Sequence, residues 1–389
     1  MPHIDARETL WVHAVSVGET QAALPLIKAL QQHYPHMTLV VTTMTPTGSA
    51  RVRAALGDTV FHVYAPYDLP GAVQRFLQRT HPRVAIIMET ELWPNLIHGC
   101  QQRGIPVIVA NARLSVRSAA GYQRVARLTR DTFQQITVIA AQAQADAQRF
   151  IALGADPARV AVTGNIKFDI TPTPDVREHA AALRRSWGAQ RPVWIAASTH
   201  ASAAGSEDEQ VLAAFATLRL TLPDALLVLV PRHPERFAKV AALCREQGYN
   251  VTRRSEQKAG NADLSSTDIY IGDSMGELMI FYAASDVAFV GGSLIPHGGH
   301  NLLEPAALGI PVLTGPHTFN FAEISRLLLD AGAARQVNNP AELAEAVIAC
   351  LQNDTLRRTT GEQGQRLVEH NRGALAKLLV IIKGCIDGK

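Results

Sequence analysis

Residues 10–33 read LWVHAVSVGETQAALPLIKALQQH, and this stretch decides the fold. It begins with a strand-length run of apolar and small residues over 10–16. After a single glycine, apolar side chains recur with helical spacing at Ala22, Leu26, Ala29 and Leu30. We therefore expect a buried strand that leads through a tight turn into an amphipathic helix over 18–33.

The same alternation of apolar runs and amphipathic stretches continues along the chain. Further strands are expected over residues 38–44, 60–65, 84–89, 107–111, 137–141, 160–164, 193–198, 225–231, 268–272, 287–291 and 312–313. Helical patterns lie between them, and from Pro340 onward the chain is expected to be helical with breaks near Asn353 and Gly373. Strands that alternate with helices of about 10–15 residues are typical of βαβ units and of a parallel sheet.

The segment TPTPD at residues 171–175 interrupts the alternation, which then starts again. Two prolines between two such series are typical of a linker. We therefore predict an α/β protein with two Rossmann-like domains, namely an N-terminal domain over 1–170, a linker over 171–190 and a C-terminal domain over 191–365. A final helix over 366–389 is expected to pack back toward the N-terminal domain. Because ligands of such sheets bind at the carboxyl ends of the strands, two facing domains would place a cleft between these ends.

The composition excludes several classes of protein. Of the 389 residues, 47% are hydrophobic and 18% are charged, which excludes a disordered or fibrous chain. A formal net charge of +3 is too small for a general nucleic-acid binder. The cysteines are scattered without a C-x-x-C pair, which indicates a reducing compartment. No apolar run approaches the roughly 18 residues of a membrane span and no signal peptide is present, so we expect a soluble chain.

The turn after the first expected strand carries a candidate general base. Within HAVSVGE, residues 13–19, Glu19 lies in the first helical turn, where the helix dipole favours an ionised carboxylate. A base must be ionised at neutral pH to accept a proton. The alternative is that Glu19 only caps the helix, and this motif alone favours that alternative.

Two further motifs place charged groups at strand ends. In METELWPN, residues 88–95, Glu89 and Glu91 follow an apolar strand directly, and alternation sends them to one side if the strand continues. The alternative is that one of them caps the next helix. In GNIKFD, residues 164–169, Lys167 lies where the last strand of the first domain enters the linker. It is placed to stabilise developing negative charge, or it is a plain surface lysine.

An arginine-rich segment makes the first domain positive. No Asp or Glu occurs between Leu92 and Arg130, whereas the segment holds Arg103, Arg113, Arg117, Arg124, Arg127 and Arg130. Residues 1–176 carry 16 basic and 12 acidic side chains, a net charge of +4, and the remainder carries 21 and 22, a net charge of −1. The arginines suit a phosphorylated ligand or an anionic membrane surface. The alternative is a solvated helix face.

The second domain concentrates glycines and polar residues after its strands. Arg232 follows the apolar strand 225–231, where it is placed for a phosphate or a carboxylate. The glycine-rich loops 272–277, 290–293 and 298–305 would let backbone N–H groups reach an anion. They match neither a dinucleotide fingerprint nor a P-loop. His297 and His300 lack a third ligand at suitable spacing, so we expect no metal site.

These residues together resemble a known family. Two Rossmann-like domains, a glycine-rich loop and an Asn-x-x-Glu-Pro helix start are similar to the GT-B glycosyltransferases. The more specific resemblance is to the 3-deoxy-D-manno-oct-2-ulosonic acid (Kdo) transferases of Gram-negative bacteria. It rests on ordered blocks between His13 and Phe321, namely HAVSVGE, TTMTPTG, PYDLP, METELWPN, NARLS, GNIKFD, STH, VPRHPERF, GDSMGEL, FVGGS, GGHNLLEPAA and GPHTFNF.

The resemblance implies a reaction and a role for each motif. CMP-Kdo would donate Kdo to the phosphorylated disaccharide precursor of lipid A (lipid IVA), with inversion at the anomeric carbon and without a metal or other cofactor. Glu19 would be the general base, and Glu89 and Lys167 would stabilise the transition state. The residues implied to hold CMP are Pro231, Arg232, Met275, Gly276, Glu277, Asn301, Leu302, Leu303 and Glu304. The lipid phosphates would contact Arg113, Arg117, Arg124 and Arg127.

The chain departs from the family pattern in two places. After STH the family continues with a Glu-Gly-Glu type segment, whereas Ala201–Ser206 stands here before Glu207, so we expect a displaced helix start. Family members also begin with a membrane-anchoring segment. We therefore expect a catalytic core without its natural anchor, which acts at the cytoplasmic face of the inner membrane. The rival hypotheses are a nucleotide-sugar epimerase on the same scaffold and a non-catalytic sugar-nucleotide or lipid-binding protein.

Overall fold

The computed structural model describes residues 8–202, 205–257 and 264–388. The chain divides into two compact units. The first unit comprises Met1–Asp169 together with Asn371–Lys389, and the second comprises Ile170–His370.

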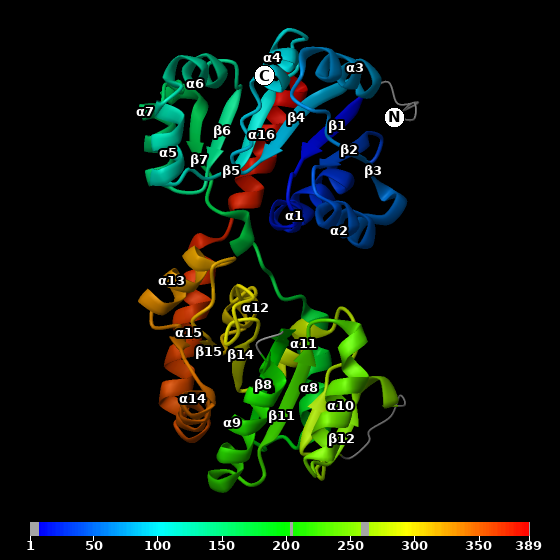
Figure 1. Ribbon diagram of the computed structural model, residues 1–389, viewed down its shortest axis with the longest axis vertical. Helices are drawn as coiled ribbons and strands as arrows, with labels where there is room; N and C mark the ends of the chain where they lie inside the picture. The colour runs from blue at the N-terminus through cyan, green and yellow to red at the C-terminus, as the bar shows by residue number, and fades with distance from the viewer. Residues whose placement is uncertain (1–7, 203–204, 258–263, 389) are drawn as a thin grey trace. The chain divides into compact units, whose positions relative to one another are not determined.

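The first unit is built on a parallel sheet of seven strands in the order β3-β2-β1-β4-β5-β6-β7 (Figure 1). The strands are β1 (Thr9–His13), β2 (Thr38–Thr43), β3 (Phe61–Tyr64), β4 (Pro82–Met88), β5 (Val107–Ala112), β6 (Val138–Ala141) and β7 (Val160–Val162). The direction of winding reverses between β1 and β4, which are neighbours in the sheet. The loops after these two strands therefore form the topological switch point, where open α/β sheets bind their ligands.

Helices cover both faces of this sheet because its central strands are apolar on both sides. Leu10 and Val12 of β1 enter one core, and Trp11 between them enters the core on the opposite face. The helices are α1 (Val17–His33), α2 (Pro46–Leu56), α3 (Pro70–Thr80), α4 (Pro94–Gln101), α5 (Val116–Gln123), α6 (Ala126–Phe133), α7 (Gln144–Ala152) and α16 (Ala374–Asp387), with short 3-10 turns at Gly57–Thr59, Pro157–Arg159 and Ile166–Phe168.

The C-terminal helix α16 belongs to the first unit, where Figure 1 shows it in red among the first strands. Leu378 and Ile382 are buried in the same core as Leu10. The Asp169 carboxylate accepts hydrogen bonds from the N–H groups of Gly373 and Leu375, both at 2.6 Å. The end of the chain thus completes one face of the first sheet.

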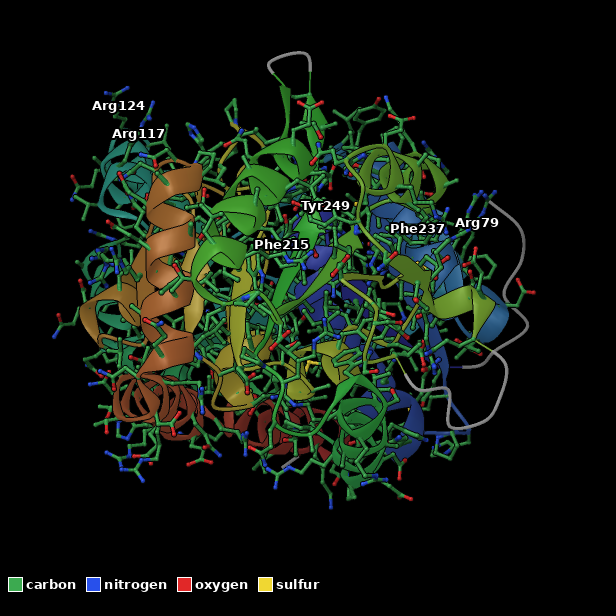
Figure 2. All side chains as sticks on the ribbon, turned by 90° about the horizontal axis from the view of Figure 1, so that it is seen from below. Arg79, Arg117, Arg124, Phe215, Phe237 and Tyr249 are labelled. Carbon is green, nitrogen blue, oxygen red and sulfur yellow. The ribbon has the colours of Figure 1, made fainter. Side chains whose placement is uncertain are left out.

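The second unit repeats the architecture with a parallel sheet in the order β12-β13-β11-β8-β14-β15-β16. Its strands are β8 (Val193–Thr199), β11 (Leu226–Pro231), β12 (Val251–Arg253), β13 (Ile269–Ile271), β14 (Val287–Val290), β15 (Val312–Thr314) and β16 (Ala334–Gln336), and a separate ribbon pairs β9 (Ala201–Ser202) with β10 (Gly205–Ser206). The switch point lies between β8 and β14. Phe215 and Tyr249, labelled in Figure 2, pack in this unit with ring centroids 5.4 Å apart.

The helices of the second unit are α8 (Pro174–Trp187), α9 (Glu207–Thr221), α10 (Phe237–Glu246), α11 (Leu278–Ala283), α12 (Leu303–Ala307), α13 (Ala322–Asp330), α14 (Pro340–Gln352) and α15 (Asp354–Asn371), with 3-10 turns at Pro234–Arg236 and Arg254–Glu256. None of the helices in the described part of the chain combines the length and apolar character that crossing a membrane requires.

The prediction of a linker over 171–190 is wrong, because helix α8 occupies most of this range and lies in the second unit. Pro174 is the first residue of α8, a position whose N–H has no partner within a helix, so the proline starts the helix instead of preventing it. The helix is anchored by the fully buried Trp187, whose ring meets that of Tyr270 with centroids 5.1 Å apart.

Candidate functional site

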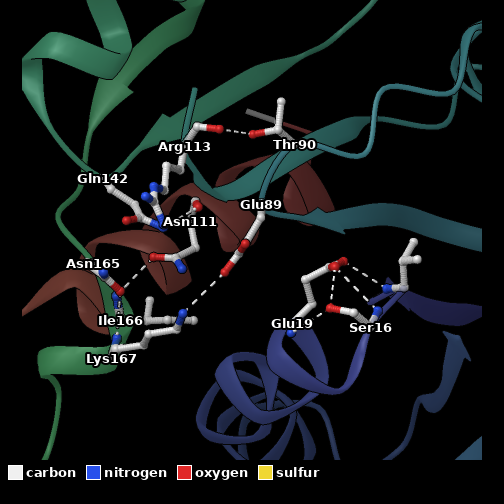
Figure 3. Close-up of polar contacts among 11 residues, drawn as sticks. Ser16, Glu19, Glu89, Thr90, Asn111, Arg113, Gln142, Asn165, Ile166 and Lys167 are labelled. Carbon is white, nitrogen blue, oxygen red and sulfur yellow. Dashed lines mark hydrogen bonds and ion pairs between the residues drawn. The ribbon is translucent and has the colours of Figure 1, made fainter. Parts of the chain in front are cut away.

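Glu19 lies at the switch point of the first unit, in the first turn of α1. Ser16 is the N-cap of this helix, and its hydroxyl and Glu19 form a reciprocal capping box. The Glu19 carboxylate accepts hydrogen bonds from the Val15 N–H at 2.8 Å and from the Ser16 hydroxyl at 2.6 Å (Figure 3). Glu19 therefore caps the helix, as the simpler alternative holds, and the same contacts fix the position of its carboxylate.

The helix dipole alone would lower the pKa of Glu19, but the structure gives a raised pKa. Burial raises the pKa of the Glu19 carboxyl, the bonds from Ser16 and Val15 oppose this shift, and the negative charges of Glu91 and Glu89 add to it. The side chain is only 8% exposed. A carboxylate with a raised pKa is a stronger base than a solvated one, so the geometry suits proton abstraction.

Glu89 and Lys167 are distant in the sequence but meet after the carboxyl ends of β4 and β7. Lys167 Nζ lies 3.4 Å from Glu89 Oε1 (Figure 3). The negative charge of Glu89 also acts on the Glu19 carboxyl. Both side chains keep about a quarter of their surface exposed, at 28% and 27%. A lysine with one exposed side retains donors for a second anion.

The backbone around Glu89 is strained in a way that the sequence pattern did not indicate. Strand β4 ends at Met88, and Glu89 has a φ of 56°, in the left-handed region. The expected alternation of Glu89 and Glu91 therefore does not hold, and Glu91 instead accepts a hydrogen bond from Trp93 Nε1 at 2.8 Å. Left-handed non-glycine residues are typical of functional sites.

Asn111 holds Lys167 in place through the backbone. It is the penultimate residue of β5, which pairs with β4, and has a φ of 53°. Its side-chain oxygen accepts the N–H of Ile166 at 3.1 Å. Asn165 Oδ1 accepts the N–H of Lys167 itself at 3.0 Å. Sequence reasoning missed Asn111, although NARLS is one of the blocks that carry the resemblance.

The four arginines predicted to bind the acceptor are exposed. Arg113 follows β5, Arg117 lies on α5, Arg124 follows α5, and Arg127 lies on α6. Figure 2 shows the side chains of Arg117 and Arg124 at the outer edge of the view. Among the described residues, Arg117, Arg124 and Arg127 form no ion pair, so their charge is available to an external anion.

Exposed apolar side chains accompany these arginines on and between α5 and α6. Val116 is 70% exposed, and Val125 and Leu128 are each 52% exposed. This surface therefore combines positive charge with exposed hydrophobic groups, which suits a phosphorylated lipid better than a small anion.

In the second unit, Arg232 and Glu304 approach each other although 72 positions separate them in the sequence. Burial raises the pKa of the Glu304 carboxyl, while the hydrogen bond from Asn301 Nδ2, at 3.3 Å, and the charge of Arg232 lower it. Arg232 follows Pro231 at the end of β11 and is exposed. The structure thus groups a cation, an amide and a carboxylate from the predicted CMP set.

The other predicted CMP residues differ in what they can offer. Leu302 and Leu303 are buried in the core, so only their backbone is available to a ligand. Met275 is 70% exposed, and Gly276 has a φ of 86°. Glu277 is already engaged, because Arg254 donates to both of its oxygens at 2.7 and 2.9 Å and thereby lowers the pKa of its carboxyl.

The glycine-rich loop after β14 binds an anion that belongs to the chain itself. The N–H groups of Gly292, Ser293 and Leu294 donate to the Glu207 carboxylate at 2.6–3.0 Å, and the N–H of His200 donates at 3.1 Å. The expectation that these loop N–H groups receive a ligand anion is therefore wrong.

Helix α9 begins at Glu207, directly after the insertion. The described residues of Ala201–Ser206 form the antiparallel ribbon of β9 and β10, and residues 203–204 lie outside the described chain. Glu207 then donates its N–H to the His200 carbonyl at 2.9 Å. In the sequence, Glu207 follows the STH block only after residues 201–206.

Comparison with known proteins decides the family. Residues 2–170 match the family described as 3-Deoxy-D-manno-octulosonic-acid transferase (kdotransferase), and residues 208–367 match glycosyl transferases group 1. The chain is 47% identical to the 3-deoxy-D-manno-octulosonic acid transferase of Haemophilus influenzae over 97% of this chain and 87% of that protein. The chain belongs to the Kdo transferase family. It is 34% identical to the Bordetella pertussis member over 95% of this chain and 86% of that protein.

Membership in the Kdo transferases confirms several predictions. The chain is a glycosyltransferase, and its two parallel-sheet units are those of the GT-B class. The crystal structure of UDP-GlcNAc 2-epimerase from Neisseria meningitidis bound to UDP-GlcNAc aligns with 96% of this chain and 98% of its own, with a TM-score of 0.61 and 13% identity. At this identity the likeness shows the shared fold, and the epimerase hypothesis gains no support from it.

Proposed function

We propose that the chain transfers Kdo from CMP-Kdo to the phosphorylated disaccharide lipid precursor of lipid A, with inversion at the anomeric carbon. The observation that carries the proposal is the group at the first switch point. The Glu19 carboxylate is buried there and held by hydrogen bonds, and the charge of Glu89, which pairs with Lys167, acts on it.

The chemistry follows from these groups. Glu19 accepts the proton of the acceptor hydroxyl as that oxygen attacks the anomeric carbon of Kdo. The bond between the anomeric carbon and the phosphate oxygen of CMP breaks, and CMP leaves with the electron pair. One base on the face opposite the leaving group is what a single inverting displacement requires. Lys167, held by Glu89, stabilises the negative charge that develops in the transition state.

The second unit supplies the donor site in this proposal. Arg232 neutralises the CMP phosphate, and Glu304, together with Asn301, binds the ribose hydroxyls. CMP carries a single phosphate, so arginine, lysine and backbone donors replace the divalent ion that a diphosphate donor commonly needs. The proposed transfer step therefore uses no metal.

The decisive experiment is to incubate the chain with CMP-Kdo and the tetraacylated, bisphosphorylated disaccharide lipid. Mass spectrometry should show one or more added Kdo residues, and nuclear magnetic resonance should show an anomeric configuration opposite to that of the donor. Retention of configuration would refute the single-base mechanism, and a product formed only with a different acceptor would refute the acceptor assignment.

The donor assignment predicts selectivity between nucleotides. Isothermal titration of the chain should give at least about tenfold tighter binding for CMP than for UDP, because the proposed site assigns Arg232 to a single nucleotide phosphate. Arg232→Ala should weaken CMP binding, whereas Arg177→Ala on the exposed surface of α8 serves as the control. Tighter binding of UDP would contradict the proposal.

The arginines of the first unit predict an effect on the acceptor alone. Reversing Arg117, Arg124 and Arg127 to Glu should raise the acceptor KM at least about tenfold, since each cation near an anionic lipid surface contributes about 1 kcal/mol. The KM for CMP-Kdo should stay unchanged. Reversing the exposed cations Arg177, Lys239 and Arg358 alters the net charge equally and should leave both constants near their original values. An unchanged acceptor KM would show that the arginines are only solvated.

A further inference from the structure

Three histidines from two loops converge at the switch point of the second unit. The candidate ligand nitrogens of His200, His297 and His300 all lie within 4.8 Å of one another. His200 Nε2 and His300 Nε2 are 2.8 Å apart, and the rings of His200 and His297 stack with centroids 3.7 Å apart. The sequence offered only His297 and His300, and the fold supplies the third imidazole from a position 97 residues earlier.

The backbone around this cluster holds the rings together. Gly298 and Gly299, with φ values of 107° and 74°, turn the chain between His297 and His300. Gly292 has a φ of 66°, and a Cβ atom there would meet the His300 ring at 3.1 Å and the His200 ring at 3.4 Å. A side chain at position 292 would therefore push the rings apart.

A single buried carboxylate fixes both loops of the cluster. Glu207 Oε2 accepts the N–H of His200 at 3.1 Å and the N–H of Gly292 at 2.6 Å. The loop that carries His297 and His300 is thus fastened to the end of β8 independently of the imidazoles themselves. Preorganisation of this kind is typical of metal sites, in which supporting bonds position the ligands.

An imidazole binds a metal ion through the lone pair of its unprotonated ring nitrogen. In the contact between the Nε2 atoms of His200 and His300, one ring donates its proton and the other offers a lone pair. Moving that proton to Nδ1 of the same ring leaves both rings neutral and both Nε2 lone pairs free.

We propose that His200, His297 and His300 form a binding site for a late first-row divalent metal ion, with Zn²⁺ as the expected occupant. Three imidazole nitrogens are the ligand set that Zn²⁺, Ni²⁺ and Cu²⁺ prefer, whereas Mg²⁺ and Ca²⁺ prefer oxygen. Three protein ligands leave a fourth position of tetrahedral Zn²⁺ open. The cluster adjoins the residues proposed to hold CMP, because His300 directly precedes Asn301 and the charge of Arg232 acts on both His297 and His300. The transfer step proposed above nevertheless uses no metal.

The test is a titration of the full chain, freed of metal by a chelator and desalted, with Zn²⁺ in competition with a chromophoric chelator. We expect one equivalent to bind, and His297→Ala and His300→Ala each to weaken its affinity at least about 30-fold. His98→Ala, which removes an exposed histidine of the first unit, should leave the affinity unchanged. X-ray absorption of the Zn²⁺ complex should show three nitrogen ligands at about 2.0–2.1 Å.

His297 is exposed, so its replacement is the variant that preserves the fold, and circular dichroism should give the same melting temperature as for the parent chain. Mg²⁺ at the same concentration should not displace Zn²⁺. The proposal fails if the chain binds no Zn²⁺ in the micromolar range, or if His297→Ala and His300→Ala bind it as tightly as the parent chain does. Because the readout is binding, it is independent of whether the transfer reaction is as proposed.

Discussion

Replacing Glu19 by Gln is expected to lower the rate of Kdo transfer by a factor of about 10²–10⁴, the usual contribution of a general base. Gln has the same shape, and its single oxygen can still accept one of the bonds from Val15 and Ser16. It cannot take up a proton. The rate at saturating substrates should therefore collapse, while the dissociation constant of CMP changes little, since CMP is assigned to residues of the other unit.

A matched variant separates catalysis from helix capping. Ser16→Ala removes the hydroxyl that bonds to Glu19 but leaves the carboxylate, and the loss of an N-cap costs about 1 kcal/mol of stability. Its transfer rate should fall far less than that of Glu19→Gln. If Glu19→Gln keeps its rate within fivefold of the parent chain, Glu19 is only a capping residue.

The pH dependence offers a second readout of Glu19. Because burial raises the pKa of this carboxyl above its ordinary value of 4.5, the base becomes protonated at a higher pH than a solvated glutamate does. The rate should fall as the pH drops through this raised pKa, and Glu19→Gln should lose this acid limb. An acid limb that persists unchanged in the variant would assign it to another group.

Replacing Glu207 by Gln is expected to destabilise the second unit by about 3 kcal/mol, which corresponds to a fall in its melting temperature of about 6–12 °C. The carboxylate accepts four backbone N–H groups with two oxygens and is fully buried. Gln turns one oxygen into an NH₂ group, so two backbone donors face another donor in a fully buried position. Calorimetry or thermal circular dichroism measures the effect.

The control for Glu207 stands two residues along the same helix. Glu209 is exposed in the first turn of α9, so Glu209→Gln removes an equal charge from the same helix end. Its effect should stay below about 1 kcal/mol, which is the contribution of a charge to a helix dipole. Equal effects of the two variants would mean that Glu207 acts through charge alone and does not fasten the loop.

The sequence predicted the helices and strands whose own residues show a clear pattern of apolar positions or of helix breaks. The apolar run and helical spacing of residues 10–33 gave β1 and α1, and the breaks near Asn353 and Gly373 separate α14, α15 and α16 as expected. The edge strands β12 and β16 were missed. Each has only three residues and is polar or partly exposed, so neither shows the buried apolar run by which the central strands are found.

In the candidate site, the sequence predicted contacts between residues that are close in the chain. It did not predict contacts between residues that the fold brings together from distant positions. Glu19 and its capping partner lie three positions apart, so their contact follows from helix geometry. The pairing of Lys167 with Glu89 and the meeting of His200 with His300 depend on how distant strand ends gather at one edge of a sheet. The left-handed backbone of Glu89 has no counterpart in residue patterns, because a non-glycine residue adopts it only when its surroundings impose it.

The return of α16 to the first unit makes that unit discontinuous in the chain. One face of its sheet is covered by Leu378 and Ile382 of α16. These residues come after the whole of the second unit in the sequence. During synthesis the second unit, which is one continuous segment, is complete before the first unit can bury this face. Until then the apolar residues of α1 and β1 stay partly uncovered. The first unit can therefore close this face only after the whole of the second unit has been synthesised.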